Sequence, residues 1–185
     1  MSELTDYLGV LRIVEPVHDS LEDRVSALEN RRELHDLILR YGSLCDARAW
    51  DELLECYCED VERILAGTLY ERVVGKDELR RRYITPTLTR SDRSGDLASP
   101  KIQSLDFLHV ITNEIIRLSS DGVAGWAAAR GQLIAWDDGS EAFRTGSHRA
   151  TWIFEFRKEG TAWKIGKLTV YSDSGHNPMF TAADT

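Results

Sequence analysis

Three residues of this chain could carry chemistry if they meet in a pocket: Tyr41, Asp46 and His109. An imidazole titrates near neutral pH and can act as a general acid or base, a carboxylate can orient it, and a phenol can donate a hydrogen bond. Burying any of these groups without a partner costs about 1 to 3 kcal/mol. Each also has a structural explanation, as a strand histidine, a helix-ending aspartate and a core tyrosine.

Helical geometry decides whether Tyr41 and Asp46 can share a site. Tyr41 lies on the apolar stripe of a predicted helix, and Asp46 follows five residues later. Five residues correspond to about 140° of rotation, so an uninterrupted helix would not place both on one face. We therefore expect Asp46 to reach a pocket only if the helix ends beside it.

His109 lies in a predicted strand, where alternate side chains face opposite ways. His109 shares one face with Phe107, Ile111 and Asn113, and the other face also contains apolar residues. Alternation alone does not say which face is buried.

Helical spacing dominates the first half of the chain. Ser20, followed by Asp23, resembles a capping box and predicts a helix over residues 20–46. We further expect a second helix over 50–58, a short strand over 61–65 and a third helix over 76–84. Residues 86–104 are rich in Ser, Thr, Asp, Gly and Pro, which predicts a long loop that is either a lid or plainly flexible.

The second half of the chain predicts long strands joined by turns. These strands are expected over residues 107–118, 123–136, 143–156 and 163–171. Helices followed by an antiparallel meander predict an α+β fold, in which a curved antiparallel sheet wraps around the N-terminal helices and encloses a pocket. We expect an N-terminal arm or short helix (1–19), one domain (20–172) and a C-terminal tail (173–185).

Composition restricts the class of protein. The chain has 185 residues with a net charge of -8, which repels nucleic acid and anionic membranes. It lacks a run of about 18 apolar residues and a signal-peptide pattern, so we expect a cytoplasmic location. The three cysteines fit reduced core residues of the second helix better than a disulfide or metal site.

Several segments resemble SnoaL-like proteins of the nuclear transport factor 2-like, or cystatin-like, superfamily. They are RYGSLCDARAWDELL (40–54), EDV (59–61), LHVITN (108–113) and FRKEGTAWKI (156–165). The resemblance spans roughly residues 30–172 and implies the fold predicted above. It does not fix the function, because this superfamily includes cyclases, dehydratases, isomerases, dioxygenase β subunits and non-enzymes.

The resemblance implies roles for the three polar residues. Asp46 and His109 match the Asp/His pair of scytalone dehydratase and hexachlorocyclohexane dehydrochlorinase, and with Tyr41 they match the set of bile acid 7α-dehydratase. His109 would be the general base, Asp46 would orient it, and Tyr41 would donate to an oxyanion or leaving group. No cofactor or metal is expected.

Further residues are expected to bind substrate. Arg130 is favoured over Arg157 and Arg149 as the pocket arginine, and Trp50 and Trp126 are candidate lining residues. The alternatives are a strand-surface arginine and core tryptophans.

Two enzyme classes of this superfamily are disfavoured. The strand near Leu65 and Ala66 lacks the acid of steroid isomerases, and the Asp-Arg-Asp set of limonene epoxide hydrolases cannot be placed.

Two classes of function follow. The first is a cofactor-independent lyase or cyclase acting on a small, apolar, cyclic substrate. The second is a non-catalytic protein, either a dioxygenase β-like subunit or a binding module. A close Asp46–His109 hydrogen bond would favour the enzyme, and a large apolar outer sheet face would favour the subunit. We expect a homodimer or homotrimer, because open sheets often bury a face by self-association.

Overall fold

The computed structural model describes residues 2–67, 71–81, 105–137 and 144–172. The predicted loop at 86–104 and the predicted tail at 173–185 lie outside the described residues. Among the described helices, none combines the length and apolarity needed to cross a membrane.

The long helix α2 (Leu21–Asp46) begins where the sequence predicts. The Asp23 N–H donates to Ser20 Oγ at 3.0 Å, and Ser20 Oγ donates to the Asp23 carboxylate at 2.6 Å. This contact satisfies one of the free amides of the first turn. At its other end, Arg48 has a φ of 54°, a left-handed conformation that stops the helix. Asp46 is therefore the last helical residue.

The strands form one open sheet in the order β2-β1-β6-β5-β4-β3. Their bounds are Tyr57–Gly67 (β1), Glu71–Val74 (β2), Leu105–Leu118 (β3), Ala124–Asp137 (β4), Arg144–Glu159 (β5) and Ala162–Ser172 (β6). Strands β3 to β6 form the predicted antiparallel meander. The α+β class and the curved sheet are confirmed, but the sheet is mixed, because β1 pairs in parallel with β6. The long connection between them permits this pairing.

Three shorter helices complete the described fold, and one of them corrects a prediction. They are α1 (Glu3–Leu11), α3 (Trp50–Leu54) and α4 (Lys76–Leu79). The predicted second helix was too long, since α3 ends at Leu54 and β1 already begins at Tyr57. Cys56 and Cys58 are buried, as expected, but lie outside any helix.

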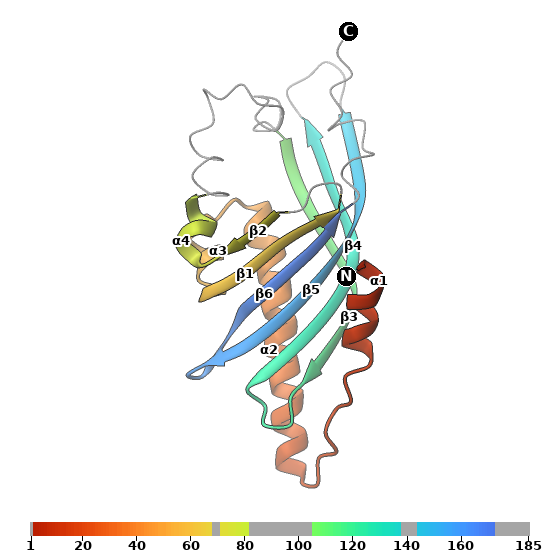
Figure 1. Cartoon of the computed structure of the whole chain (residues 1–185), viewed down its shortest axis with the longest axis vertical. Helices are drawn as coiled ribbons and strands as arrows, with labels where there is room; N and C mark the ends of the chain where they lie inside the picture. The colour runs from red at the N-terminus through yellow and green to blue at the C-terminus, as the bar shows by residue number, and fades with distance from the viewer. Residues whose placement is uncertain (1, 68–70, 82–104, 138–143, 173–185) are drawn as a thin grey trace.

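The helices cover the two faces of the sheet unequally (Figure 1). We call the face covered by α2 the inner face and the opposite face the outer face. Helix α2 buries Leu34, Ile38 and Tyr41 against the inner face in the main hydrophobic core. Helix α1 packs on the outer face, where Val10 contacts a small cluster that contains Ala128. The inner face is thus the side on which polar residues can be enclosed.

Candidate active site

Asp46 and His109 meet at the C-terminal end of α2. The Asp46 carboxylate accepts a hydrogen bond from His109 Nδ1 at 2.5 Å. It also accepts the backbone N–H of His109 at 3.0 Å to both oxygens. The His109 and Asp46 side chains are 14% and 19% exposed, so the pair is largely buried but keeps some contact with solvent. This is the close hydrogen bond that we expected to favour an enzyme over a non-catalytic protein.

A glycine allows the helix and the strand to approach each other here. A Cβ atom on Gly42 would lie 3.3 Å from Ile111 Cδ1 and 3.4 Å from His109 Cβ. Such contacts are tight, so the bare backbone of Gly42 helps α2 lie close against β3. The end of α2 at Asp46 and this close approach together bring the carboxylate to His109.

A β-bulge in β3 explains why both faces of this strand look apolar in the sequence. The pairing register with β4 shifts between Thr112 and Ile115, and Asn113 has a φ of 50°. A bulge reverses the alternation of the residues that follow it. Ile111 packs against the core before the bulge, and Ile116 and Leu118 pack there after it. Both faces therefore look apolar in the sequence, although His109 and Ile111 both face α2.

Tyr41 is buried next to the pair. Its side chain is 3% exposed, and its ring meets His109 edge-on with 6.1 Å between centroids. Burial raises the pKa of the Tyr41 hydroxyl well above its ordinary value, with the Cys45 thiol and Tyr57 acting in the same direction and Arg63 opposing them. Tyr41 therefore remains a neutral hydrogen-bond donor at physiological pH.

Arg63 is a candidate that sequence reasoning missed. It lies on β1 opposite Val73 and Leu168, both of which are buried. Directly opposed residues point to the same face, so Arg63 points inward. The sequence does carry a signal for this position, because the charged Arg63 alternates with the apolar Val61 and Leu65.

Aromatic side chains form the wall around Tyr41. Phe154 meets Tyr41 edge-on with 5.7 Å between ring centroids, and Trp152 lies 6.1 Å from the His109 ring. Trp50, a candidate lining residue, is partly buried against the same core. This environment is largely apolar.

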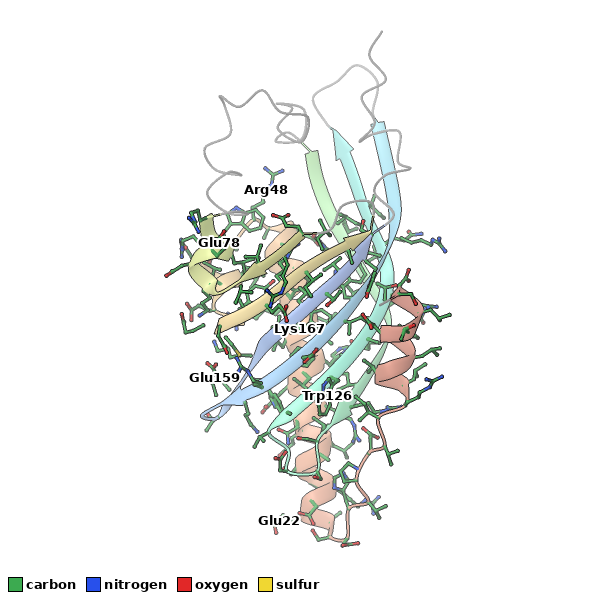
Figure 2. All side chains as sticks on the ribbon, viewed as in Figure 1. Glu22, Arg48, Glu78, Trp126, Glu159 and Lys167 are labelled. Carbon is green, nitrogen blue, oxygen red and sulfur yellow. The ribbon has the colours of Figure 1, made fainter. Side chains whose placement is uncertain are left out.

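The structure does not bring Arg130 and Trp126 to the Asp46–His109 pair. Both lie on the outer face, where the guanidinium of Arg130 sits 4.1 Å above the Tyr7 ring. Trp126 packs beside Tyr7 in the outer cluster, on the face turned away from α2 (Figure 2). Alternation along β4 explains this: Ala127 belongs to the main core on the inner face, whereas Ala128 shares the outer cluster with Trp126.

Arg157 also lies on the outer face, within a network of ion pairs. It donates to the Asp60 carboxylate, and this contact lowers the pKa of Asp60. Lys167 lies 3.4 Å from Glu62 and 3.6 Å from Glu155. This part of the outer face is charged, not apolar.

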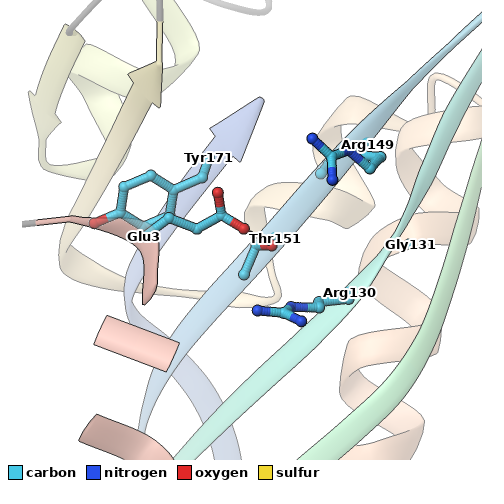
Figure 3. A pocket seen from close by; sticks show the side chains of 7 residues that line it. Glu3, Arg130, Gly131, Arg149, Thr151 and Tyr171 are labelled. Carbon is cyan, nitrogen blue, oxygen red and sulfur yellow. Dashed lines mark hydrogen bonds between the residues drawn. The ribbon is translucent and has the colours of Figure 1, made fainter. Parts of the chain in front are cut away.

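A cavity of about 260 Å³ lies between α1 and the outer face (Figure 3). Arg130 and Arg149 line it together with Glu3, whose carboxylate accepts a hydrogen bond from Thr151 at 2.6 Å. Helix α1 is further fastened to the sheet by the Tyr171 hydroxyl, which donates to Asp6. A carboxylate of the chain itself thus enters this cavity, which is separated from His109 by the sheet.

The described segments contain no cluster of three or more His, Cys, Asp and Glu side chains that could hold a metal ion. The three cysteines are free thiols, and burial raises the pKa of Cys45 to about 12.

Comparison with known proteins identifies the family and the fold. Residues 26–169 match the model of the SnoaL-like domain. No curated protein matches the sequence.

Solved structures share the fold at low sequence identity. An NTF2-like protein with a cystatin-like fold from Novosphingobium aromaticivorans is 21% identical, with a TM-score of 0.58 over 84% of this chain and 91% of that one. The β subunit of benzoate 1,2-dioxygenase from Burkholderia mallei is 19% identical (TM-score 0.60; 77% and 90% covered). A type 2 hexachlorocyclohexane dehydrochlorinase is 16% identical (TM-score 0.60; 81% and 89% covered). At these identities the similarity establishes the fold alone.

Proposed function

The chain belongs to the SnoaL-like domain family, and on that premise we propose that it is a lyase with His109 as its general base. It would remove a proton from carbon and expel a leaving group from the neighbouring carbon of a small, apolar, cyclic substrate. The same proton transfer would serve a cyclase.

The observation that carries the proposal is the contact between Asp46 and His109 Nδ1 at 2.5 Å. An ionised carboxylate only accepts hydrogen bonds, so it holds the proton of the neutral imidazole on Nδ1. The other nitrogen, Nε2, is then the acceptor that a general base requires.

Tyr41 supports the second half of the reaction. Its hydroxyl is held neutral by burial and can donate to an oxygen that gains negative charge. His109 Nε2 would take the proton, and the C–H electron pair would become the new double bond as the leaving group departs with its own pair. A departing hydroxide would take the proton back from His109 and leave as water.

The outer face bears on the alternative of a dioxygenase β-like subunit. Such a subunit would be expected to dock a catalytic chain, and the benzoate dioxygenase β subunit shares this fold. The outer face, however, carries the network of Asp60, Glu62, Glu155, Arg157 and Lys167, and α1 covers another part of it. Its polarity supports an enzyme over an apolar docking surface.

Proton exchange tests the proposal without knowledge of the leaving group. The protein is incubated in D₂O with cyclic ketones such as 2-tetralone, and loss of the α-proton signal is followed by NMR. We expect exchange faster than in buffer, and a loss of roughly 100-fold or more in His109→Gln. The matched control is His35→Gln, a histidine on α2 that pairs with Glu114 away from Asp46.

Two results would contradict the proposal. One is equal exchange in His109→Gln and wild type. The other is exchange that wild type does not accelerate for any ketone of the series.

A further inference from the structure

We propose that the cavity between α1 and the outer face is a second binding site, which takes a small organic anion with a carboxylate or phosphate group. The anionic group would lie between Arg130 and Arg149, on the opposite side of the sheet from His109. This inference is independent of the proposed function, because neither Asp46 nor His109 lines this cavity.

Strand pairing builds one wall of the cavity from a row of three polar side chains. Arg130 on β4 is paired directly with Thr151 on β5, and Thr151 is paired directly with Tyr171 on β6. Directly opposed residues point to the same side of a sheet, so all three point to the outer face, where they line the cavity (Figure 3). This row presents a guanidinium and two hydroxyl groups on one surface of the sheet.

Arg149 adds a second positive charge beside this row. It lies two residues before Thr151 on β5, which places it on the same face and makes it the diagonal neighbour of Arg130. Diagonal neighbours on adjacent antiparallel strands are about 7 to 8 Å apart, a distance that long side chains can span. Arg149 also interacts elsewhere in the protein, but a guanidinium has five N–H donors. Both arginines can therefore contact one anionic group.

The Arg130 guanidinium is positioned by a contact that does not use its hydrogen-bond donors. Its central carbon lies 4.1 Å from the centroid of the Tyr7 ring, and this cation–π contact is made without an oxygen acceptor. Among the described residues, no oxygen accepts a hydrogen bond from this guanidinium. The fork of its N–H groups matches the two oxygens of a carboxylate or phosphate group.

The charges that line the cavity favour an anion. Arg130 and Arg149 contribute two positive charges and Glu3 contributes one negative charge, although the chain as a whole has a net charge of -8. The Glu3 carboxylate accepts its hydrogen bond from Thr151, which is only 3% exposed. Like charges on neighbouring strands repel each other, so an anion placed between the two arginines would be attracted to both.

The size of the cavity favours an organic anion over an inorganic ion. Its volume of about 260 Å³ corresponds to roughly nine water molecules. Tyr171 and the small residues Gly131 and Ala150 contribute less polar surface to the same cavity. We therefore expect a ligand in which a compact organic body carries the carboxylate or phosphate group.

A chemical-shift titration tests the site with phenylacetate and phenyl phosphate, which share an aromatic ring and differ in the anionic group. Each is added at constant ionic strength while the backbone amide signals of Gly131 and Thr151 are followed. We expect saturable shifts with at least one of the two anions and about tenfold weaker binding of the neutral benzyl alcohol. The anion that binds more tightly shows whether the site prefers a carboxylate or a phosphate group.

Two substitutions should change the affinity in opposite directions. Arg130→Gln should weaken binding of the anion about tenfold or more, and Arg130→Lys, which keeps the charge but loses the fork, should weaken it less. Glu3→Gln removes the opposing charge, keeps an acceptor for Thr151 and should strengthen binding about two- to fivefold. The matched control is Arg157→Gln, an outer-face arginine that pairs with Asp60 away from this cavity, and it should bind like wild type.

Four results would overturn the site. They are the absence of saturable shifts with both anions, equal affinity for benzyl alcohol, unchanged affinity in Arg130→Gln, and weaker binding in Glu3→Gln, which would indicate a ligand that is positively charged near Glu3. If Arg130→Gln does not fold, Arg149→Gln takes its place with the same expected loss. None of these results affects the proton exchange proposed for His109, because the sheet separates the two sites.

Discussion

The Asp46 carboxylate accepts hydrogen bonds from two groups of His109, the ring Nδ1 and the backbone N–H. The two residues are 63 positions apart, one ending α2 and the other near the start of β3. The contact therefore orients the imidazole and also ties the end of the helix to the strand.

Asp46→Asn separates these two effects. The amide can still accept the backbone N–H, but its NH₂ group would face Nδ1 and favour the tautomer protonated on Nε2. We expect proton exchange to fall by roughly 10²- to 10⁴-fold, while the fold is retained. The tautomer is read from ¹⁵N–¹H spectra of the imidazole, with Asp36→Asn, an exposed aspartate of α2, as the control. An unchanged tautomer would argue against Asp46 as the orienting group.

Gly131→Ala should be strongly destabilising. A Cβ at this position would overlap the carbonyl oxygen of Val110, which belongs to the strand that carries His109. The strands must separate to admit the methyl group, at a cost of about 2 kcal/mol or more. In Gly9→Ala nothing lies within 4 Å of the new Cβ, and the change within α1 should stabilise by up to about 1 kcal/mol. Urea unfolding measures both, and similar midpoints for the two variants would refute the predicted clash.

Stability should fall as pH rises above about 9, and Cys45 should account for part of this loss. Burial raises the pKa of its thiol from 9.0 to about 12. A raised pKa in the folded state means that the unfolded chain ionises first, so stability is complete below pH 9 and declines between pH 9 and 12. At pH 10 the effect is on the order of 1 kcal/mol.

Cys45→Ala tests this assignment. The variant should lose less stability than wild type between pH 8 and pH 10.5, measured as the shift of the urea midpoint. An identical decline in both proteins would exclude Cys45 as a source.

The attachment of α1 should depend on Val10. This side chain is 4% exposed and contacts the outer cluster, whereas Leu4 of the same helix is 56% exposed. Removing the buried side chain costs about 1 to 2 kcal/mol of local packing. Amide hydrogen exchange in α1 should therefore be about tenfold faster in Val10→Ala and unchanged in Leu4→Ala. Equal protection in both variants would mean that polar contacts such as Asp6–Tyr171 hold the helix.

Local signals were sufficient to predict most of the fold. The Ser20 cap and the apolar spacing fixed the start of α2, and the meander followed from β-rich runs between turns. The parallel pairing of β1 with β6 could not be predicted in this way, because pairing between distant strands leaves no local pattern. The sequence predicts a helix as far as Cys58, whereas Tyr57 and Cys58 already belong to β1, because short apolar runs fit both helix and strand.

The site was predictable only in part for a related reason. Asp46 was expected at the end of α2, and the structure places it there beside His109. The faces of Trp126, Arg130 and Arg157 could not be inferred, since bulges reverse alternation and only tertiary packing shows which parity is buried. The position of Arg63, in contrast, could have been inferred, because its alternation with buried neighbours along β1 indicates that it points inward.

Strand β6 is the last of the described strands, yet it lies in the interior of the sheet between β1 and β5. During synthesis, β1–β2 and β3–β5 therefore exist as separate pieces until Ala162–Ser172 leaves the ribosome. Asp46 lies before the first piece and His109 within the second. We therefore expect the Asp46–His109 contact to settle only after β6 has been made, and until then we expect nascent chains to expose two unpaired strand edges that need protection from aggregation.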